Sequence, residues 1–284
     1  MVSKHIWFAM SKLLNITDLS SRFKRSERMP VVFLGHGSPM NAIMDTEYSR
    51  SWQALGKSLP KPQAILVVSA HWVSKSNTLV DISNAPATIH DFYGFPEELY
   101  NEKYSALGSP ELATKVASML EHQGGKIDDT WGLDHGSWSV LKYLFPDADV
   151  PVFQISIDMS RDLKHQLEVG AVLKSLRDHG VLILGSGNIV HNLSRLSFSE
   201  RSKPEDFAVE FDALFSEKLL NRDFDTISDR TKLGTLLDQA HPSVDHYLPA
   251  LTIAGTTDMK DELVFMTDNI DLGSISMRSF VFHN

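Results

Sequence analysis

The feature that most constrains the fold is a series of short, continuous apolar runs separated by helical patterns. Residues 30–34, 64–70, 150–157 and 180–187 are of this kind. An apolar run of this length, without alternating polar residues, is typical of a strand that is buried on both faces. Residues 274–282 instead alternate apolar and polar side chains, and they predict a last, more exposed strand.

Helical patterns fill the intervals between these runs. Residues 110–120, 162–176 and 207–220 carry apolar side chains at helical spacing. Ser109 and Pro110 predict the start of the first helix, with serine at the cap and proline in the first turn. The alternation of strands and helices predicts an α/β fold in a single domain. We expect a central twisted sheet, mostly parallel or mixed, with helices on both faces.

Residues 1–28 differ from the rest of the chain in charge. They contain six lysine and arginine residues against two acidic ones, within a chain whose net charge is −9. We predict that they form a basic N-terminal extension outside the fold, and that residues 29–284 form the catalytic domain. The apolar part of this segment is interrupted by Lys4 and Lys12 and has no small-residue cleavage pattern, so a secretory signal is not indicated.

Charge and hydropathy also bear on the surroundings of the protein. No apolar stretch approaches the roughly 20 residues that are needed to span a bilayer. The net charge of −9 disfavours the phosphate contacts of nucleic-acid binding. The sequence therefore predicts a soluble, cytoplasmic protein that binds neither membranes nor nucleic acid.

The chain has no cysteine, which excludes disulfides, a thiolate nucleophile and cysteine-ligated metals. Any metal site must use imidazole, carboxylate, amide or water ligands. His36 follows the first apolar run, His71 follows the second, and His191 comes soon after the fourth. Ligands of open α/β sheets bind beyond the carboxyl ends of the strands, so these three histidines can converge on one point.

Three further motifs leave alternatives open. His135 follows Asp134, and this pair either serves acid–base chemistry or places Asp134 as the cap of the next helix. His241 and His246 are separated by a proline, so their spacing does not select a ligand. Asp245 either binds a metal or caps the helix that follows it, and capping is the favoured interpretation.

Six segments carry a resemblance to a known family. They are Gly35-His36-Gly37-Ser38-Pro39-Met40-Asn41, Ser69-Ala70-His71-Trp72, Ile89-His90-Asp91-Phe92, Asp134-His135-Gly136-Ser137-Trp138, Ser186-Gly187-Asn188 with Val190-His191-Asn192, and His246-Tyr247-Leu248-Pro249. In this order and spacing, the chain resembles the class III extradiol ring-cleavage dioxygenases, and within them the DOPA-dioxygenase branch. The resemblance extends from about Met29 to Phe282.

The resemblance implies a non-haem Fe(II) site with His36, His71 and His246 as the metal ligands. It also implies that His191 is the acid–base residue and that His135 lines the substrate site. The expected partners are a catechol such as DOPA and O2, and the expected product is a semialdehyde acid. Zn(II) is a plausible metal to find in the purified protein, because zinc binds imidazole more tightly than ferrous iron does.

Two other functions use the same residues. A zinc-dependent hydrolase would activate water at the metal, with His191 as the base. A non-catalytic metal or small-ligand binding module would need only the ligands. The presence of His135 and His191 beyond the three expected ligands disfavours this last alternative, since a binding module needs no acid–base pair.

Overall fold

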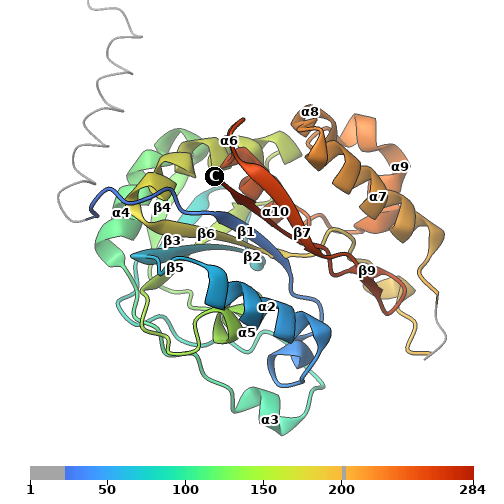
Figure 1. Cartoon of the computed structure of the whole chain (residues 1–284), viewed down its shortest axis with the longest axis horizontal. Helices are drawn as coiled ribbons and strands as arrows, with labels where there is room; N and C mark the ends of the chain where they lie inside the picture. Colours follow the sequence, from blue (N-terminus) through green and yellow to red (C-terminus); the bar gives the residue numbers. More distant parts are fainter. Residues whose placement is uncertain (1–22, 200–202) are drawn as a thin grey trace, which may run out of the picture.

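The computed structural model describes residues 23–199 and 203–284. Within these residues, the centre is an eight-stranded sheet with the order β4-β3-β5-β2-β6-β1-β10-β7 (Figure 1). Its strands are β1 (Val31–Gly35), β2 (Ala64–Ser74), β3 (Thr78–Asp81), β4 (Gly125–Asp128), β5 (Val152–Asp158), β6 (Val181–Gly187), β7 (Glu262–Thr267) and β10 (Ser279–His283). The short strands β8 (Ile270–Asp271) and β9 (Ile275–Ser276) pair separately.

The sheet is mixed. Strands β5, β2, β6 and β1 pair in parallel, whereas β10 is antiparallel to both β1 and β7. In β1, Val31 and Phe33 enter one core cluster, while Val32 and Leu34 enter the other. Both faces of this strand are therefore covered, which explains why its sequence is continuously apolar.

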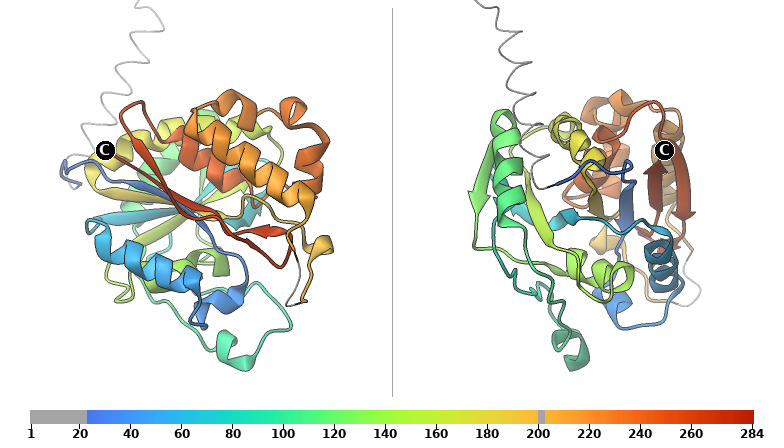
Figure 2. Two further views of the ribbon diagram at one scale, coloured as in Figure 1. Left: turned by 45° about the vertical axis from the view of Figure 1, so that its right-hand side comes forward. Right: turned by 60° about the vertical axis from the view of Figure 1, so that its left-hand side comes forward.

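Helices cover both faces of the sheet (Figure 2). The helices α4 (Pro110–Met119), α6 (Leu163–Leu173), α7 (Asp206–Leu220), α9 (Arg230–Ala240) and α10 (Leu248–Gly255) supply the core of one face. The helices α2 (Glu47–Ser58) and α5 (His135–Leu144) supply the core of the other. Two short helices, α3 (Glu97–Tyr100) and α8 (Phe224–Ile227), lie in the connections. The predicted α/β class, with a mixed sheet between helical layers, is confirmed.

The last predicted strand differs from the structure. Residues 274–282 are divided between β9 and β10, and β10 is buried rather than exposed. The reason is its position between β1 and β7, where Phe280 and Phe282 pack into the core between the sheet and a helical layer. Strands β3, β4 and β7 were not predicted, because they lie toward the sheet edges and their short sequences mix polar with apolar residues.

The predicted N-terminal extension falls mostly on residues 1–22, which lie outside the described residues. Of the remainder, the amide of Ser26 donates to the carbonyl of Asp178 at 3.1 Å, and Arg28 Nη1 lies 2.7 Å from Asp178 Oδ1. The division at residue 28 therefore stays a prediction. Among the described helices, none is both long enough and apolar enough to cross a bilayer.

Candidate metal centre

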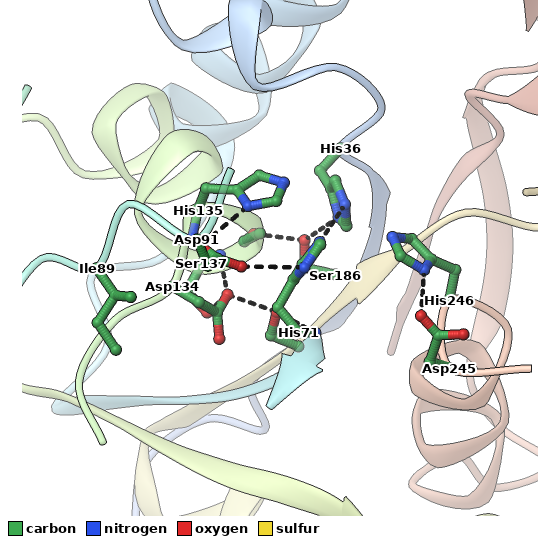
Figure 3. A network of polar contacts seen from close by, with 12 residues as sticks. His36, His71, Ile89, Asp91, Asp134, His135, Ser137, Ser186, Asp245 and His246 are labelled. Atoms are coloured by element: carbon green, nitrogen blue, oxygen red, sulfur yellow. Dashed lines mark hydrogen bonds and ion pairs between the residues drawn. The ribbon is translucent and has the colours of Figure 1, made fainter. Parts of the chain in front are cut away.

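Five histidines from separate elements lie around one point beyond the carboxyl ends of the central strands. His36 directly follows β1, His71 lies in β2, and His135 is the first residue of α5. His191 follows β6, and His246 precedes α10. Figure 3 shows four of these rings, from His36, His71, His135 and His246, facing one another. The structure thus brings together every histidine that the sequence placed at the site.

The position of His71 corrects the sequence interpretation in one respect. His71 does not stand past the end of its strand, because β2 continues to Ser74. The pairing of β2 with β5 is irregular between Val68 and Val73, so the segment around His71 leaves the regular register. Next to it, a side chain on Gly136 would place its Cβ 2.9 Å from His71 Cδ2. Glycine at this position is what lets α5 approach the His71 ring.

The ring positions suit a metal ion. The centroids of His36, His71 and His246 are 5.0 to 5.3 Å apart in all three pairs. The Nε2 atoms of His36 and His71 are 3.1 Å apart, as expected of two imidazole nitrogens that are each about 2.0–2.1 Å from one ion. By the distances between ligand atoms, however, His135 is the third member of the group, because ligand atoms of His36, His71 and His135 lie within 4.8 Å of one another. The choice of the third ligand stays a prediction.

Each ring of the expected ligand set is anchored through its Nδ1 atom. His36 Nδ1 lies 2.9 Å from Ser186 Oγ, and Ser186 itself donates to the carbonyl of Gly136 at 2.5 Å. The hydroxyl proton is thus committed, so His36 Nδ1 must be the donor. His246 Nδ1 lies 2.8 Å from Asp245 Oδ2. Partners of this kind leave the Nε2 lone pairs directed at the centre, as metal ligands require.

Asp91 lies in one of the six segments that resemble the family, but no role for it was predicted from the sequence. Its Oδ2 atom lies 3.1 Å from His71 Nδ1, and its Oδ1 atom lies 3.0 Å from His135 Nδ1. Burial alone would raise the pKa of Asp91, but hydrogen bonds from His135 and His71 hold this pKa well below its usual range. Asp91 is therefore a carboxylate at neutral pH, and no spacing in the sequence indicates its partners.

Burial also sets the charge of the histidines. It lowers the pKa of His36 and His246 well below the ordinary value, and the neighbouring imidazoles lower both further. Burial lowers the pKa of His191 to about 4. For His71, burial acts in the same direction, but the hydrogen bond to Asp91 raises its pKa overall. The neutral imidazoles of His36 and His246 fit a divalent cation, because a metal ligand must offer an unprotonated nitrogen.

The two aspartates that precede histidines of the centre have different roles. Asp134 caps α5, since its Oδ1 atom accepts from the amide of Ser137 at 3.1 Å, and this alternative is confirmed. The favoured capping role of Asp245 was wrong. Helix α10 begins at Leu248 with no side-chain cap, and Asp245 instead accepts from His246 Nδ1. The physical reason is that the imidazole N–H competes for the carboxylate that a cap would use.

His191 lies beside the expected ligand His246. The two rings are stacked, with centroids 3.5 Å apart and planes 6° apart. The amide of His191 donates to the carbonyl of Ala240 at 3.0 Å, which fixes the backbone at this point. A neutral imidazole in this position can receive a proton from a molecule bound at the centre.

His241 does not join the centre. Its Nε2 atom lies 2.7 Å from the carbonyl of Ile189, and its ring packs against Phe211 and Tyr247. Burial lowers the pKa of His241 to about 3. This histidine therefore supports the fold and holds the segment that precedes His191.

The buried His241 predicts an acid-sensitive contribution to stability. Its folded-state pKa is below the unfolded value, so the unfolded chain binds the extra proton, and stability is lost as the pH falls below about 6.5 toward about 3. This one group should cost about 1 kcal/mol between pH 6.5 and 5.5. Denaturant unfolding of the wild type and His241→Gln at both pH values measures this. An unchanged pH slope in the variant would contradict it.

Comparisons with known proteins show what the whole chain is similar to. Residues 30–276 match the family profile described as the catalytic LigB subunit of aromatic ring-opening dioxygenase. The chain is 42% identical over 260 residues to the 4,5-DOPA dioxygenase extradiol of Escherichia coli K12, covering 89% of this chain and 94% of that one. It is 36% identical to the 4,5-DOPA dioxygenase extradiol of Beta vulgaris, covering 88% and 95%. The crystal structure of an uncharacterized Escherichia coli K12 protein matches with a TM-score of 0.79 and 37% identity, covering 90% of this chain and all of that one.

Proposed function

The chain belongs to the family of the catalytic LigB subunit of aromatic ring-opening dioxygenases, and from this premise we propose that it opens a DOPA-like catechol with O2 to a semialdehyde acid. Its activity is that of an extradiol ring-cleaving dioxygenase, as the sequence predicted. The observation that carries the substrate proposal is the group of converging neutral imidazoles beside a further pair of histidines. The zinc hydrolase and the binding module are not favoured by these relatives.

We propose that His36, His71 and His246 hold Fe(II). The family is metal-dependent, and ligand atoms of His36, His71 and His135 lie close enough together to hold an ion, while the ring of His246 lies 5.0 to 5.3 Å from the rings of His36 and His71. When bound, the ion would supply positions at which both catechol oxygens and dioxygen meet on one template. A site of neutral imidazoles leaves the ion its full positive charge, which favours a catecholate ligand. The same site accepts Zn(II), so the purified protein is expected to contain zinc unless iron is supplied.

We propose that His191 is the acid–base residue. Because burial lowers its pKa to about 4, the ring is neutral at pH 7 and can accept a proton at once. The negative charge that develops on the substrate oxygens then favours the protonated ring, which raises its pKa while the substrate is bound. His191 can therefore take the proton from a catechol hydroxyl and return it when the ring opens.

We propose that His135 lines the substrate site. Its ring centroid is 3.9 Å from that of His71 and 5.6 Å from that of Phe92. Phe92 is itself buried, with 6% of its surface exposed. This apolar contact keeps water from one side of the imidazole. We therefore expect the nitrogen that faces the centre to form its hydrogen bond with a polar group of the substrate.

Oxygen uptake tests the proposed reaction. Protein stripped of metal, reconstituted anaerobically with Fe(II) and given L-DOPA should consume one O2 per substrate and develop a yellow absorbance. The Zn(II)-loaded protein should do neither, because zinc has no redox chemistry. An oxygen electrode and a visible spectrum measure both. No uptake with L-DOPA or with a panel of simpler catechols would refute the proposed substrate class.

A further inference from the structure

Asp91 lies in the connection between β3 and α3, and its carboxylate touches histidines from two other elements. One oxygen contacts Nδ1 of His71 in β2, and the other contacts Nδ1 of His135 in α5. The backbone amide of His135 also donates to Asp91 Oδ1 at 2.8 Å. Asp245, by contrast, contacts the single ring of His246. Figure 3 shows Asp91 behind the His135 ring, away from the centre.

These contacts determine which nitrogen of each ring carries the proton. His71 Nδ1 lies 3.1 Å and His135 Nδ1 lies 3.0 Å from an oxygen of Asp91, and because a carboxylate only accepts hydrogen bonds, Asp91 favours the tautomer of each ring that carries the proton on Nδ1. The Nε2 atom of a neutral ring then keeps its lone pair. For His71 this lone pair suits a metal ion, and for His135 it suits the proton of a substrate hydroxyl. The Asp91 carboxylate thus orients both the proposed metal ligand His71 and the proposed proton acceptor His135.

The connection that carries Asp91 is itself anchored. The amide of Ile89 donates to the carbonyl of Leu133 at 2.7 Å, and Trp138 Nε1 donates to the carbonyl of Ile89 at 2.8 Å. Leu133 and Trp138 flank His135 in the sequence. The segment before Asp91 is therefore fixed to the same part of α5 that carries His135, and the carboxylate has little freedom to move away from that ring.

His191 lacks this kind of support in its described contacts. Its ring is held by stacking on His246, with 3.5 Å between the centroids, and its backbone is held by Ala240. Stacking fixes the plane of an imidazole but does not select the nitrogen that carries the proton. Of these two histidines, His135 is therefore the one whose tautomer a carboxylate favours, as expected of a ring that must accept a proton at one particular atom.

We propose that Asp91 is a positioning residue that fixes the metal ligand His71 and the substrate-facing His135 with one carboxylate. This inference rests on the proposed function, because it needs a metal and a catechol at the centre. It gives His135 the role of a second proton acceptor, beside His191. It also means that a change at Asp91 acts on metal affinity through His71 and on turnover through His135.

The test separates these two effects. Co(II) titration of the metal-free protein reports metal affinity without any turnover, and oxygen uptake at saturating Fe(II) reports kcat. We expect Asp91→Asn to lower Co(II) affinity by about 10- to 100-fold and kcat by about 10-fold. The matched variant Asp245→Asn should lower Co(II) affinity over the same range, but lower kcat much less, because within residues 23–199 and 203–284 the Asp245 carboxylate pairs with His246 and not with His135.

A double-mutant cycle identifies His135 as the route to kcat. In a His135→Gln background, Asp91→Asn should leave kcat at saturating Fe(II) where it was, while Co(II) affinity still falls. A full further loss of kcat in that background would overturn the proposal, as would a wild-type kcat in Asp91→Asn. Unchanged Co(II) affinity of Asp91→Asn refutes its role at His71. Absence of catechol-dependent uptake by the wild type refutes the proposed function instead. Circular dichroism of each variant checks that it is folded.

Discussion

Replacing His246 by alanine is expected to remove the bound metal, and with it all oxygen uptake, whereas His135→Ala should keep the metal. The rings of His36, His71 and His246 are spaced almost equally, at 5.0 to 5.3 Å, as three ligands around one ion would be. His135 instead lies 3.9 Å from His71 and shares the carboxylate of Asp91 with it. That arrangement places His135 beside a ligand rather than opposite one.

The expected loss of metal affinity in His246→Ala is larger than the loss of about 10- to 100-fold that is typical when a hydrogen-bond partner of a ligand is removed. Metal analysis after dialysis against Fe(II) or Co(II) measures it directly, and it needs no substrate. His135→Ala is the matched control, because its ring lies in the same cluster. Retention of metal by His246→Ala, together with loss of metal from His135→Ala, would make His36, His71 and His135 the ligand set.

Much of this site follows from the sequence because strand ends in an α/β sheet are adjacent in space. The apolar runs before His36 and His191 predict β1 and β6, which pair in parallel through Val31 and Ile183. Two residues that follow neighbouring parallel strands must lie close together, even when they are far apart in the chain. The convergence of His36 and His191 therefore needs only the strand assignment, whereas His71 lies within β2, where the pairing with β5 is irregular.

The supporting carboxylates could not be predicted in this way. Asp91 lies in an irregular connection, where no period relates a residue to its neighbours in space. Asp245 precedes a helix, and this position alone indicates a cap, although the imidazole of His246 takes its carboxylate instead. In both cases the deciding contact is between side chains. The histidines can be identified from the sequence, but which carboxylate pairs with which histidine depends on how the loops pack.

Replacing His191 by alanine is expected to keep the metal and to lower kcat by at least about 100-fold, or about 2.7 kcal/mol of transition-state stabilisation. His191 contacts His246 through a stacked ring face, so its removal does not take a nitrogen from the proposed ligand set. Its pKa of about 4 makes it neutral at pH 7, and this readiness to accept a proton is lost with the imidazole.

Oxygen uptake at saturating Fe(II) measures the loss of kcat in His191→Ala, and Co(II) titration confirms that the metal is retained. His241→Gln is the control, since His241 is a buried histidine that bonds to Ile189 and lies outside the centre. A kcat near the wild-type value in His191→Ala would remove this residue from the acid–base role. His135, which Asp91 supports, would then be the remaining proton acceptor. The double variant His135→Gln with His191→Ala distinguishes the two cases. Its kcat should be lower than that of His135→Gln alone only if both rings accept the substrate proton.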